Sequence, residues 1–154
     1  MKLNLGANDR AFPGFLSVDI CEPADFIADL TKPWPWPDSS VDEALAFDVF
    51  EHLPDKRNTM NELFRVLKAG GKATIEVPVF PGVGAVCDPT HISYWSAGDF
   101  EYYEFGNFAR ERFRGSSYYG VKADFRILGH EFSVYSNKFG EEVKKFKIVM
   151  EAVK

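Results

Sequence analysis

The stretch Val41–Val79, VDEALAFDVFEHLPDKRNTMNELFRVLKAGGKATIEVPV, decides the fold of this chain. Its first residues, 41–47, form a nearly continuous apolar run, which is typical of a buried central strand. Asp55 is a suitable N-cap for a helix that follows. The apolar residues of that helix fall at i, i+3, i+4 and i+7, namely Met60, Leu63, Phe64 and Leu67.

A basic last turn followed by glycine, Lys68–Gly71, is predicted to end this helix, and residues 72–79 to form the next strand. A strand, a helix and a strand within 41–79 predict a parallel crossover unit. Ser96 and Asp99 have capping-box spacing and predict a second helix start. The other predicted strands, the last two joined as a hairpin, are 2–5, 15–20, 26–28, 123–135 and 143–153. We therefore expect an α/β fold, mostly parallel, with a C-terminal antiparallel hairpin and reduced helices.

Length and composition limit the possible functions. A chain of 154 residues predicts one domain, 1–154. The net charge of −5 argues against a nucleic-acid partner, and we interpret the run Arg110, Arg112 and Arg114 as a solvated helix face. Two cysteines without metal-type spacing indicate free, buried thiols in a reducing compartment. With no long apolar run, we expect a soluble cytoplasmic protein with no membrane contact.

Acidic residues follow the predicted second and third strands. Ligands of an open parallel sheet bind at the carboxyl ends of its strands, so these positions are candidates for a site. A glycine turn at Gly6 lets the backbone approach a ligand closely. The Asp19 carboxylate can accept both hydroxyls of a ribose, and the Asp29 carboxylate can meet an adenine amine. Together they predict a nucleoside site.

The glycine pattern discriminates between nucleoside cofactors. A dinucleotide site needs three glycines and an acid about 20 residues on. Here Gly6-Ala7-Asn8 has one glycine, and Asp19 follows it by 13 residues. S-adenosylmethionine has no phosphate and carries a cationic sulfonium, so it tolerates the loss of a phosphate-binding helix. S-adenosylmethionine is thus the predicted cofactor, and a nucleotide-dependent oxidoreductase is disfavoured.

Several segments also resemble a known family, the short class I S-adenosylmethionine-dependent methyltransferases of the type 11 group. The resemblance covers about residues 2–96 and rests on LNLGAN (3–8), PGF (13–15) leading to VD (18–19), ADL (28–30), PWPDSSVD (35–42), FEHLPD (50–55) and LFRVLKAGG (63–71). It implies a Rossmann-like class I methyltransferase sheet. It also implies a cofactor site formed by Asn4, Gly6, Ala7, Asn8, Asp19, Ile20, Asp29, Leu30, Phe47 and Asp48.

The chain also departs from the family pattern. The usual G-x-G is replaced by Gly6-Ala7-Asn8, and helices that often cover the acceptor are missing before the first strand. These departures leave an alternative open, in which the chain is a catalytically inactive module that binds the cofactor or a partner. They also suggest an open site, or one completed by a second subunit in a homodimer.

The long segment 80–95 offers groups for the methyl acceptor, which we expect to be a small molecule. His91 is the predicted base and Asp88 its orienting carboxylate, while Tyr94 and Trp95 would form an aromatic wall. A loop histidine that only bonds backbone is the alternative for His91. His52 is a second candidate for the acceptor side, although its place in the FEHLPD motif favours a structural role, in which it stabilises the turn before the helix. The spacing of Asp48, Glu51 and His52 resembles that of metal-dependent methyltransferases, but with one histidine we expect no metal.

Overall fold

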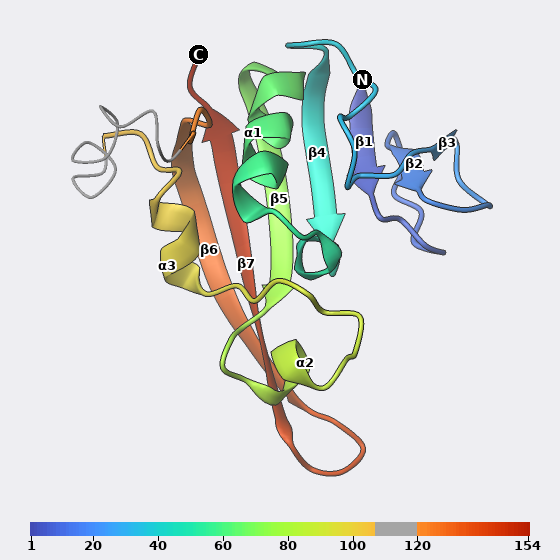
Figure 1. Cartoon of the computed structure of the whole chain (residues 1–154), viewed down its shortest axis with the longest axis vertical. Helices are drawn as coiled ribbons and strands as arrows, with labels where there is room; N and C mark the ends of the chain where they lie inside the picture. The colour runs from blue at the N-terminus through green and yellow to red at the C-terminus, as the bar shows by residue number, and fades with distance from the viewer. Residues whose placement is uncertain (107–119) are drawn as a thin grey trace.

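A seven-stranded sheet forms the centre of the computed structural model, which describes residues 1–106 and 120–154 (Figure 1). The strands are β1 (Lys2–Leu5), β2 (Leu16–Asp19), β3 (Phe26–Ile27), β4 (Val41–Phe47), β5 (Leu67–Pro78), β6 (Phe125–Ser136) and β7 (Glu142–Ala152). Their order is β3-β2-β1-β4-β5-β7-β6. The first five run parallel, and β7 is antiparallel to both β5 and β6. The predicted α/β sheet with its C-terminal hairpin is confirmed.

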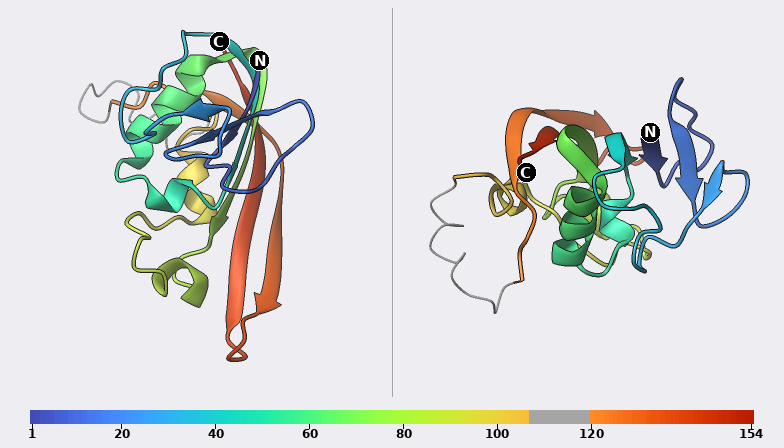
Figure 2. Two further views of the ribbon diagram at one scale, coloured as in Figure 1. Left: turned by 90° about the vertical axis from the view of Figure 1, so that its right-hand side faces the viewer. Right: turned by 90° about the horizontal axis from the view of Figure 1, so that it is seen from above.

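Short helices follow the strands. They are the 3-10 turn η1 (Phe50–His52), α1 (Lys56–Val66), α2 (Val83–Val86) and α3 (Ala97–Glu101). Asp55 caps α1 by accepting a hydrogen bond from the Asn58 backbone N–H, as predicted. Ser96 and Asp99 form the predicted capping box of α3. Within the described residues, α1, α2 and α3 all lie on one face of the sheet (Figure 2).

The end of α1 differs from the prediction. The helix stops at Val66, and Leu67 already belongs to β5, paired with Val41. The backbone N–H groups of Ser39 and Ser40 donate to the carbonyls of Arg65 and Val66, each at 2.9 Å. These long-range bonds satisfy the last helix turn without a glycine cap. The glycines after Lys68 lie instead within β5, beside the register shift between β4 and β5.

The two faces of the sheet have different chemistry. Along β5, alternate residues such as Ile75 and Val77 are fully buried on the helix-covered face. On the other face, Glu76 lies opposite Lys147, and ion pairs replace apolar packing. These pairs are Lys145–Glu76 at 3.4 Å, Lys147–Glu131 at 2.7 Å and Arg126–Glu151 at 2.7 Å. In the antiparallel part formed by β5, β7 and β6, one face therefore carries the core and the other is solvated, as antiparallel sheets allow.

Three further expectations have different outcomes. The run Arg110, Arg112 and Arg114 lies outside the described residues. Cys21 and Cys87 are free, but both are exposed, so the expected burial of their thiols is wrong. In the part of the chain that the structure describes, no helix is long and apolar enough to cross a lipid bilayer.

Arg65 fastens the tryptophan- and proline-rich segment before β4 onto α1. Its guanidinium donates to the carbonyl oxygens of Trp34 at 3.0 Å and Trp36 at 2.8 Å. It also pairs with the Glu62 carboxylate at 2.8 Å, and this hydrogen bond lowers the pKa of Glu62. Both indole rings are buried in the core, at 3% and 5% exposure. Glu62 adds to this attachment, because its carboxylate accepts from the Trp34 backbone N–H at 2.8 Å.

We expect Arg65→Met to lower the free energy of unfolding by about 2–4 kcal/mol, because it removes the Arg65 donor from two backbone carbonyls and leaves the Glu62 carboxylate with the Trp34 N–H but without its cation. Urea unfolding measures this loss. Arg126→Met is the matched control, because Arg126 pairs with Glu151 at the surface and its side chain is 61% exposed. Its loss is expected to stay within about 0.5 kcal/mol. Equal losses for the two variants would contradict this role of Arg65.

Candidate functional site

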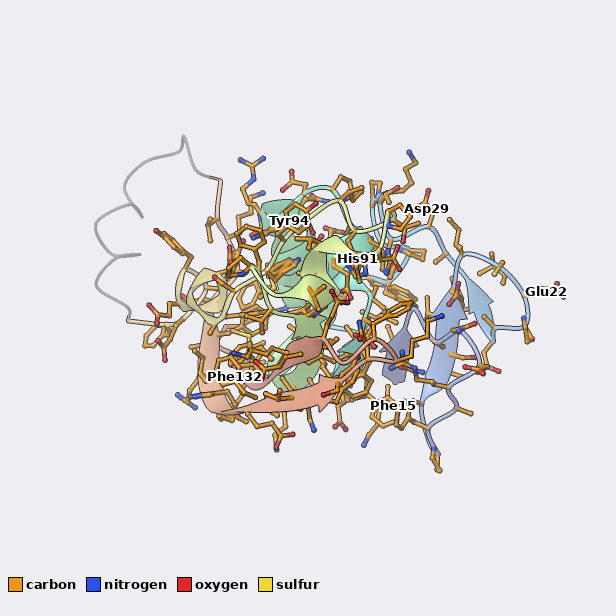
Figure 3. The ribbon with its side chains drawn as sticks, turned by 90° about the horizontal axis from the view of Figure 1, so that it is seen from below. Phe15, Glu22, Asp29, His91, Tyr94 and Phe132 are labelled. Atoms are coloured by element: carbon orange, nitrogen blue, oxygen red, sulfur yellow. The ribbon has the colours of Figure 1, made fainter. Side chains whose placement is uncertain are left out.

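A pocket opens where β1 and β4 part. These neighbouring strands run parallel, but β1 leads toward β2 on one side and β4 toward β5 on the other. The pocket has a volume of about 330 Å³, which suits a small-molecule ligand. Its lining comprises Gly6, Asn8, Asp19, Ile20, Ala28, Asp29, Leu30, Thr31, Asp48, Val49, His52 and Leu53. Figure 3 views the molecule from this end of the sheet, with Asp29 labelled.

The close packing of Gly6 and Val49 forms the base of the pocket. Gly6 has a φ of +58°, a left-handed conformation that favours glycine. A Cβ at Gly6 would lie 2.1 Å from Cγ2 of Val49. The turn after β1 therefore needs a residue without a side chain.

The carboxylates after β2 and β3 are held by backbone donors. Asp19 accepts hydrogen bonds from the N–H groups of Asn8 at 2.8 Å and Ile20 at 2.7 Å. Asp29 accepts from the Thr31 hydroxyl at 2.6 Å and the Thr31 N–H at 2.9 Å, which lowers its pKa. Both acids remain among the pocket-lining residues. The site thus presents two fixed carboxylates on the side of β2 and β3.

A third acid, Asp48, is paired with two cations. Its φ of +58° turns the chain after β4. One carboxylate oxygen accepts from Arg10 at 3.0 Å and from Lys145 at 2.7 Å. Lys145 reaches it from β7, so the C-terminal hairpin contributes directly to the site. The charge of Asp48 is compensated within the protein.

Three predicted cofactor residues lie behind the pocket rather than on its lining. Asn4 is buried and its side-chain amide donates to the Arg10 carbonyl at 2.8 Å. Ala7 is also buried, and the Phe47 ring packs against Phe12 with centroids 5.6 Å apart. These residues support the turns that carry the lining. Sequence reasoning did not name the lining residues Ala28, Thr31, Val49 and Leu53, which immediately neighbour predicted ones.

The segment 80–95 is attached to η1 by backbone hydrogen bonds. The carbonyl of Glu51 accepts from the N–H groups of Ile92 at 2.9 Å and Ser93 at 3.0 Å. The Ser93 hydroxyl donates to the Phe50 carbonyl at 2.9 Å. These bonds bring His91 beside η1, so the two predicted histidines meet with ring centroids 4.8 Å apart.

Asp88 does not orient His91 as predicted. The Asp88 Oδ2 lies 3.8 Å from His91 Nε2, which exceeds hydrogen-bonding distance. Its other oxygen accepts from the hydroxyl and the N–H of Thr90, and these bonds lower the pKa of Asp88. His91 is oriented instead by its Nδ1, which lies 3.2 Å from the Ala85 carbonyl. His52, and not His91, is on the pocket lining.

Glu51 is the buried acid next to both histidines. The residue is 2% exposed, and neither carboxylate oxygen has a hydrogen-bond partner among the described residues. Its Oε1 lies 3.9 Å from His91 Nε2. Burial raises the pKa of Glu51 to about 7, and the nearby Asp48 carboxylate adds to the rise. The sequence around Glu51, EHLP, does not predict this burial. The burial follows from the contact of η1 with the segment 80–95.

Of the two residues of the predicted aromatic wall, Trp95 is unsuited to that role, while the role of Tyr94 stays a prediction. Trp95 is fully buried, stacked on Phe100 at 5.1 Å and packed against Phe50, so it has no surface for an acceptor. Tyr94 is 44% exposed and lies beside Phe80. The alternation along this extended segment sends neighbouring side chains in opposite directions.

This architecture defines a class of protein. An open sheet of this order, with an antiparallel C-terminal pair and a pocket at the β1/β4 divergence, is the fold of the class I methyltransferases. Residues 15–75 match the family described as a methyltransferase domain. A probable S-adenosylmethionine-dependent methyltransferase of Mycolicibacterium smegmatis is 36% identical over 69 residues. That match covers 42% of this chain and 27% of the relative, so the chain spans about a quarter of it.

Solved structures have the same fold at low sequence identity. A methyltransferase of Methanosarcina mazei superimposes with a TM-score of 0.65 at 14% identity, covering 99% of this chain and 92% of that one. The 1,6-didemethyltoxoflavin-N1-methyltransferase of Burkholderia thailandensis, bound to 1,6-didemethyltoxoflavin and S-adenosylhomocysteine, gives 0.62 at 13% identity, covering 99% and 71%. The resemblance to class I S-adenosylmethionine-dependent methyltransferases that the sequence predicts is confirmed.

Replacing Gly6 tests the packing at the base of the pocket. Gly14→Ala is the matched control, because Gly14 also has a positive φ but no atom within 4 Å of an added Cβ. We expect Gly14→Ala to cost about 1–2 kcal/mol of unfolding free energy from the left-handed backbone alone. Gly6→Ala is expected to cost about 1–3 kcal/mol more, because Val49 must move. Urea unfolding measures the loss of unfolding free energy in both variants. Equal losses would show that Val49 can move away from an added Cβ at no cost.

Proposed function

We propose that this chain binds S-adenosylmethionine in the pocket at the β1/β4 divergence and transfers its methyl group to a small-molecule acceptor. The observation that carries the proposal is the convergence of Gly6, Asp19 and Asp29 on one pocket of about 330 Å³. The family match over residues 15–75 supports the same cofactor.

In this proposal the adenosine lies toward β2 and β3. The Asp19 carboxylate, already fixed by two backbone donors, keeps lone pairs for the ribose hydroxyls. Asp29 and Leu30 flank the adenine, and the Gly6 turn lies under the cofactor. The methionine end then points toward Asp48 and the acceptor side. When bound, the sulfonium supplies an activated methyl carbon for in-line attack by an acceptor lone pair.

The acceptor in this proposal lies between His52 and the segment 80–95. Methyl transfer needs alignment above all, with a proton acceptor if the attacking group carries a proton. His52 on the pocket lining, with His91 in contact behind it, is placed to serve that end of the pocket. Exposed Tyr94 is the remaining aromatic candidate. A small acceptor agrees with the name of the Burkholderia thailandensis relative and with the net charge of −5.

Calorimetric titration with S-adenosylmethionine and S-adenosylhomocysteine tests cofactor binding, with NAD as the negative ligand. We expect Asp19→Asn to weaken binding of both about 10- to 100-fold, the loss of a charged hydrogen-bonding partner. Asp25→Asn is the control, because Asp25 is also an acid that accepts from a backbone N–H, at Ser17, but it does not line this pocket. Its affinity is expected to stay unchanged. Failure of the wild-type chain to bind either ligand would refute the proposed cofactor.

Turnover separates an enzyme from an inactive module. Release of S-adenosylhomocysteine is measured with a panel of small phenols, amines and nitrogen heterocycles as acceptors. With an acceptor that reacts, we expect His52→Gln to lower kcat at least about 100-fold, the usual contribution of a positioned acid–base group. The cofactor affinity is expected to be retained. Tight cofactor binding without turnover for every acceptor would favour the inactive module.

A further inference from the structure

Glu51, His52 and His91 form a compact group of potential ligand atoms beside the pocket. One atom from each side chain lies within 4.8 Å of the other two. We call these three residues the Glu51 cluster. Two of them come from η1 and the third from the segment 80–95, so the fold brings together residues forty positions apart.

Hydrogen bonding leaves the Nε2 of neutral His91 without a proton. Its Nδ1 lies 3.2 Å from the Ala85 carbonyl oxygen, which can only accept, so Nδ1 must donate. In the neutral ring the proton is then on Nδ1, and Nε2 carries a lone pair. That Nε2 lies 3.9 Å from Glu51 Oε1.

His52 is likewise oriented through its Nδ1. Its Nδ1 lies 3.1 Å from the Thr90 hydroxyl and 3.2 Å from the Thr90 carbonyl. The Thr90 hydroxyl donates its only proton to Asp88 at 2.6 Å, so it cannot donate to the ring. His52 Nδ1 therefore donates to Thr90, and Nε2 of the neutral ring is the free lone pair.

The Glu51 cluster thus brings together acceptor atoms that have no hydrogen-bond donor among the described residues: the Glu51 carboxylate oxygens and the Nε2 atoms of His52 and His91. The Glu51 side chain is almost wholly buried, with both oxygens unpartnered among the described residues. A buried polar group without a partner is costly, and a cation bound by the cluster offsets this cost. We propose that the Glu51 cluster binds a divalent transition-metal ion, with Zn²⁺ as its representative. Two imidazoles and one carboxylate are a donor set that such ions prefer.

The surroundings fit a metal centre. Each histidine is oriented through Nδ1 by a backbone carbonyl, the outer-shell arrangement typical of metal-binding histidines. Bonds of about 2.0–2.1 Å to a tetrahedral ion place ligand atoms about 3.4 Å apart, so ligand atoms that now lie within 4.8 Å of one another need to close by up to about 1.4 Å. His52 is also on the pocket lining, so the proposed metal site borders the pocket.

This inference goes beyond the proposed function, because the metal would bind whether or not the chain transfers a methyl group. It also changes the roles of His52 and His91. A metal bound at their Nε2 atoms occupies the lone pairs that a base would use, so in the metal-loaded protein both histidines are ligands and neither is the base. Three protein ligands and an open position are typical of catalytic zinc.

Calorimetric titration of the apo chain with ZnCl₂, without cofactor, tests the proposal. The titrations use a Cys21→Ser, Cys87→Ser background, because both thiols are exposed and bind zinc themselves. We expect one site per chain with a dissociation constant in the micromolar range or below. His91→Gln and His52→Gln are each expected to weaken it by more than about 100-fold, and Thr90→Val by about 10- to 100-fold.

His130→Gln is the matched control, because it removes the remaining histidine of the chain, on β6 away from the cluster. It is expected to leave the affinity unchanged, and circular dichroism confirms that each variant is folded. Equal zinc affinity in wild type, His91→Gln and His130→Gln would overturn the proposal, as would no binding at all. In that case protonation of the cluster satisfies Glu51. S-adenosylmethionine binding is measured separately without metal, so the two proposals fail independently.

Discussion

Gly6 and Val49 touch where two neighbouring parallel strands send the chain in opposite directions. The contact requires that residue 6 have no side chain, because Cγ2 of Val49 lies 2.1 Å from the place where a Cβ would be. It also requires a positive φ on both strand ends, at Gly6 and at Asp48. With these turns fixed, the Asp19 carboxylate meets the Asn8 N–H and Asp48 meets Arg10 and Lys145. The pocket is a consequence of this divergence.

The arrangement of helices on one face explains how so short a chain carries this pocket. The connection between β1 and β2, residues 6–15, contains no helix, and on the second face it packs the Phe12 ring against Phe47 instead. That face is stable in water because its positions on β5 and β7 are charged and paired, as Glu76 and Lys147 show. A second layer of helices would need apolar residues at those positions. The charged residues on the second face of β5 and β7 thus agree with the absence of a helix in the connection 6–15.

Local patterns in the sequence predicted most of the fold, since strands, caps and turn glycines depend on nearby residues. The lining acids Asp19 and Asp29 could be predicted because parallel strands end at one edge. The end of α1 could not, because Ser39 and Ser40 satisfy its last carbonyls from 26 residues away. The burial of Trp95 and the pairing of His91 with Glu51 depend on backbone hydrogen bonds between segments about forty residues apart. No local pattern encodes such contacts.

Glu51 combines two roles that are physically separate. Its backbone carbonyl accepts from Ile92 and Ser93 and so fixes the segment 80–95, while its carboxylate has no hydrogen-bond partner in the part of the chain that the structure describes. A residue needed only for the backbone contact would be more stable with an apolar side chain, because an unpartnered buried carboxylate costs free energy. The fold therefore bears a cost at Glu51 that its architecture does not require. A cost of this kind, next to two histidines and a ligand pocket, indicates that the carboxylate is retained for chemistry rather than for stability.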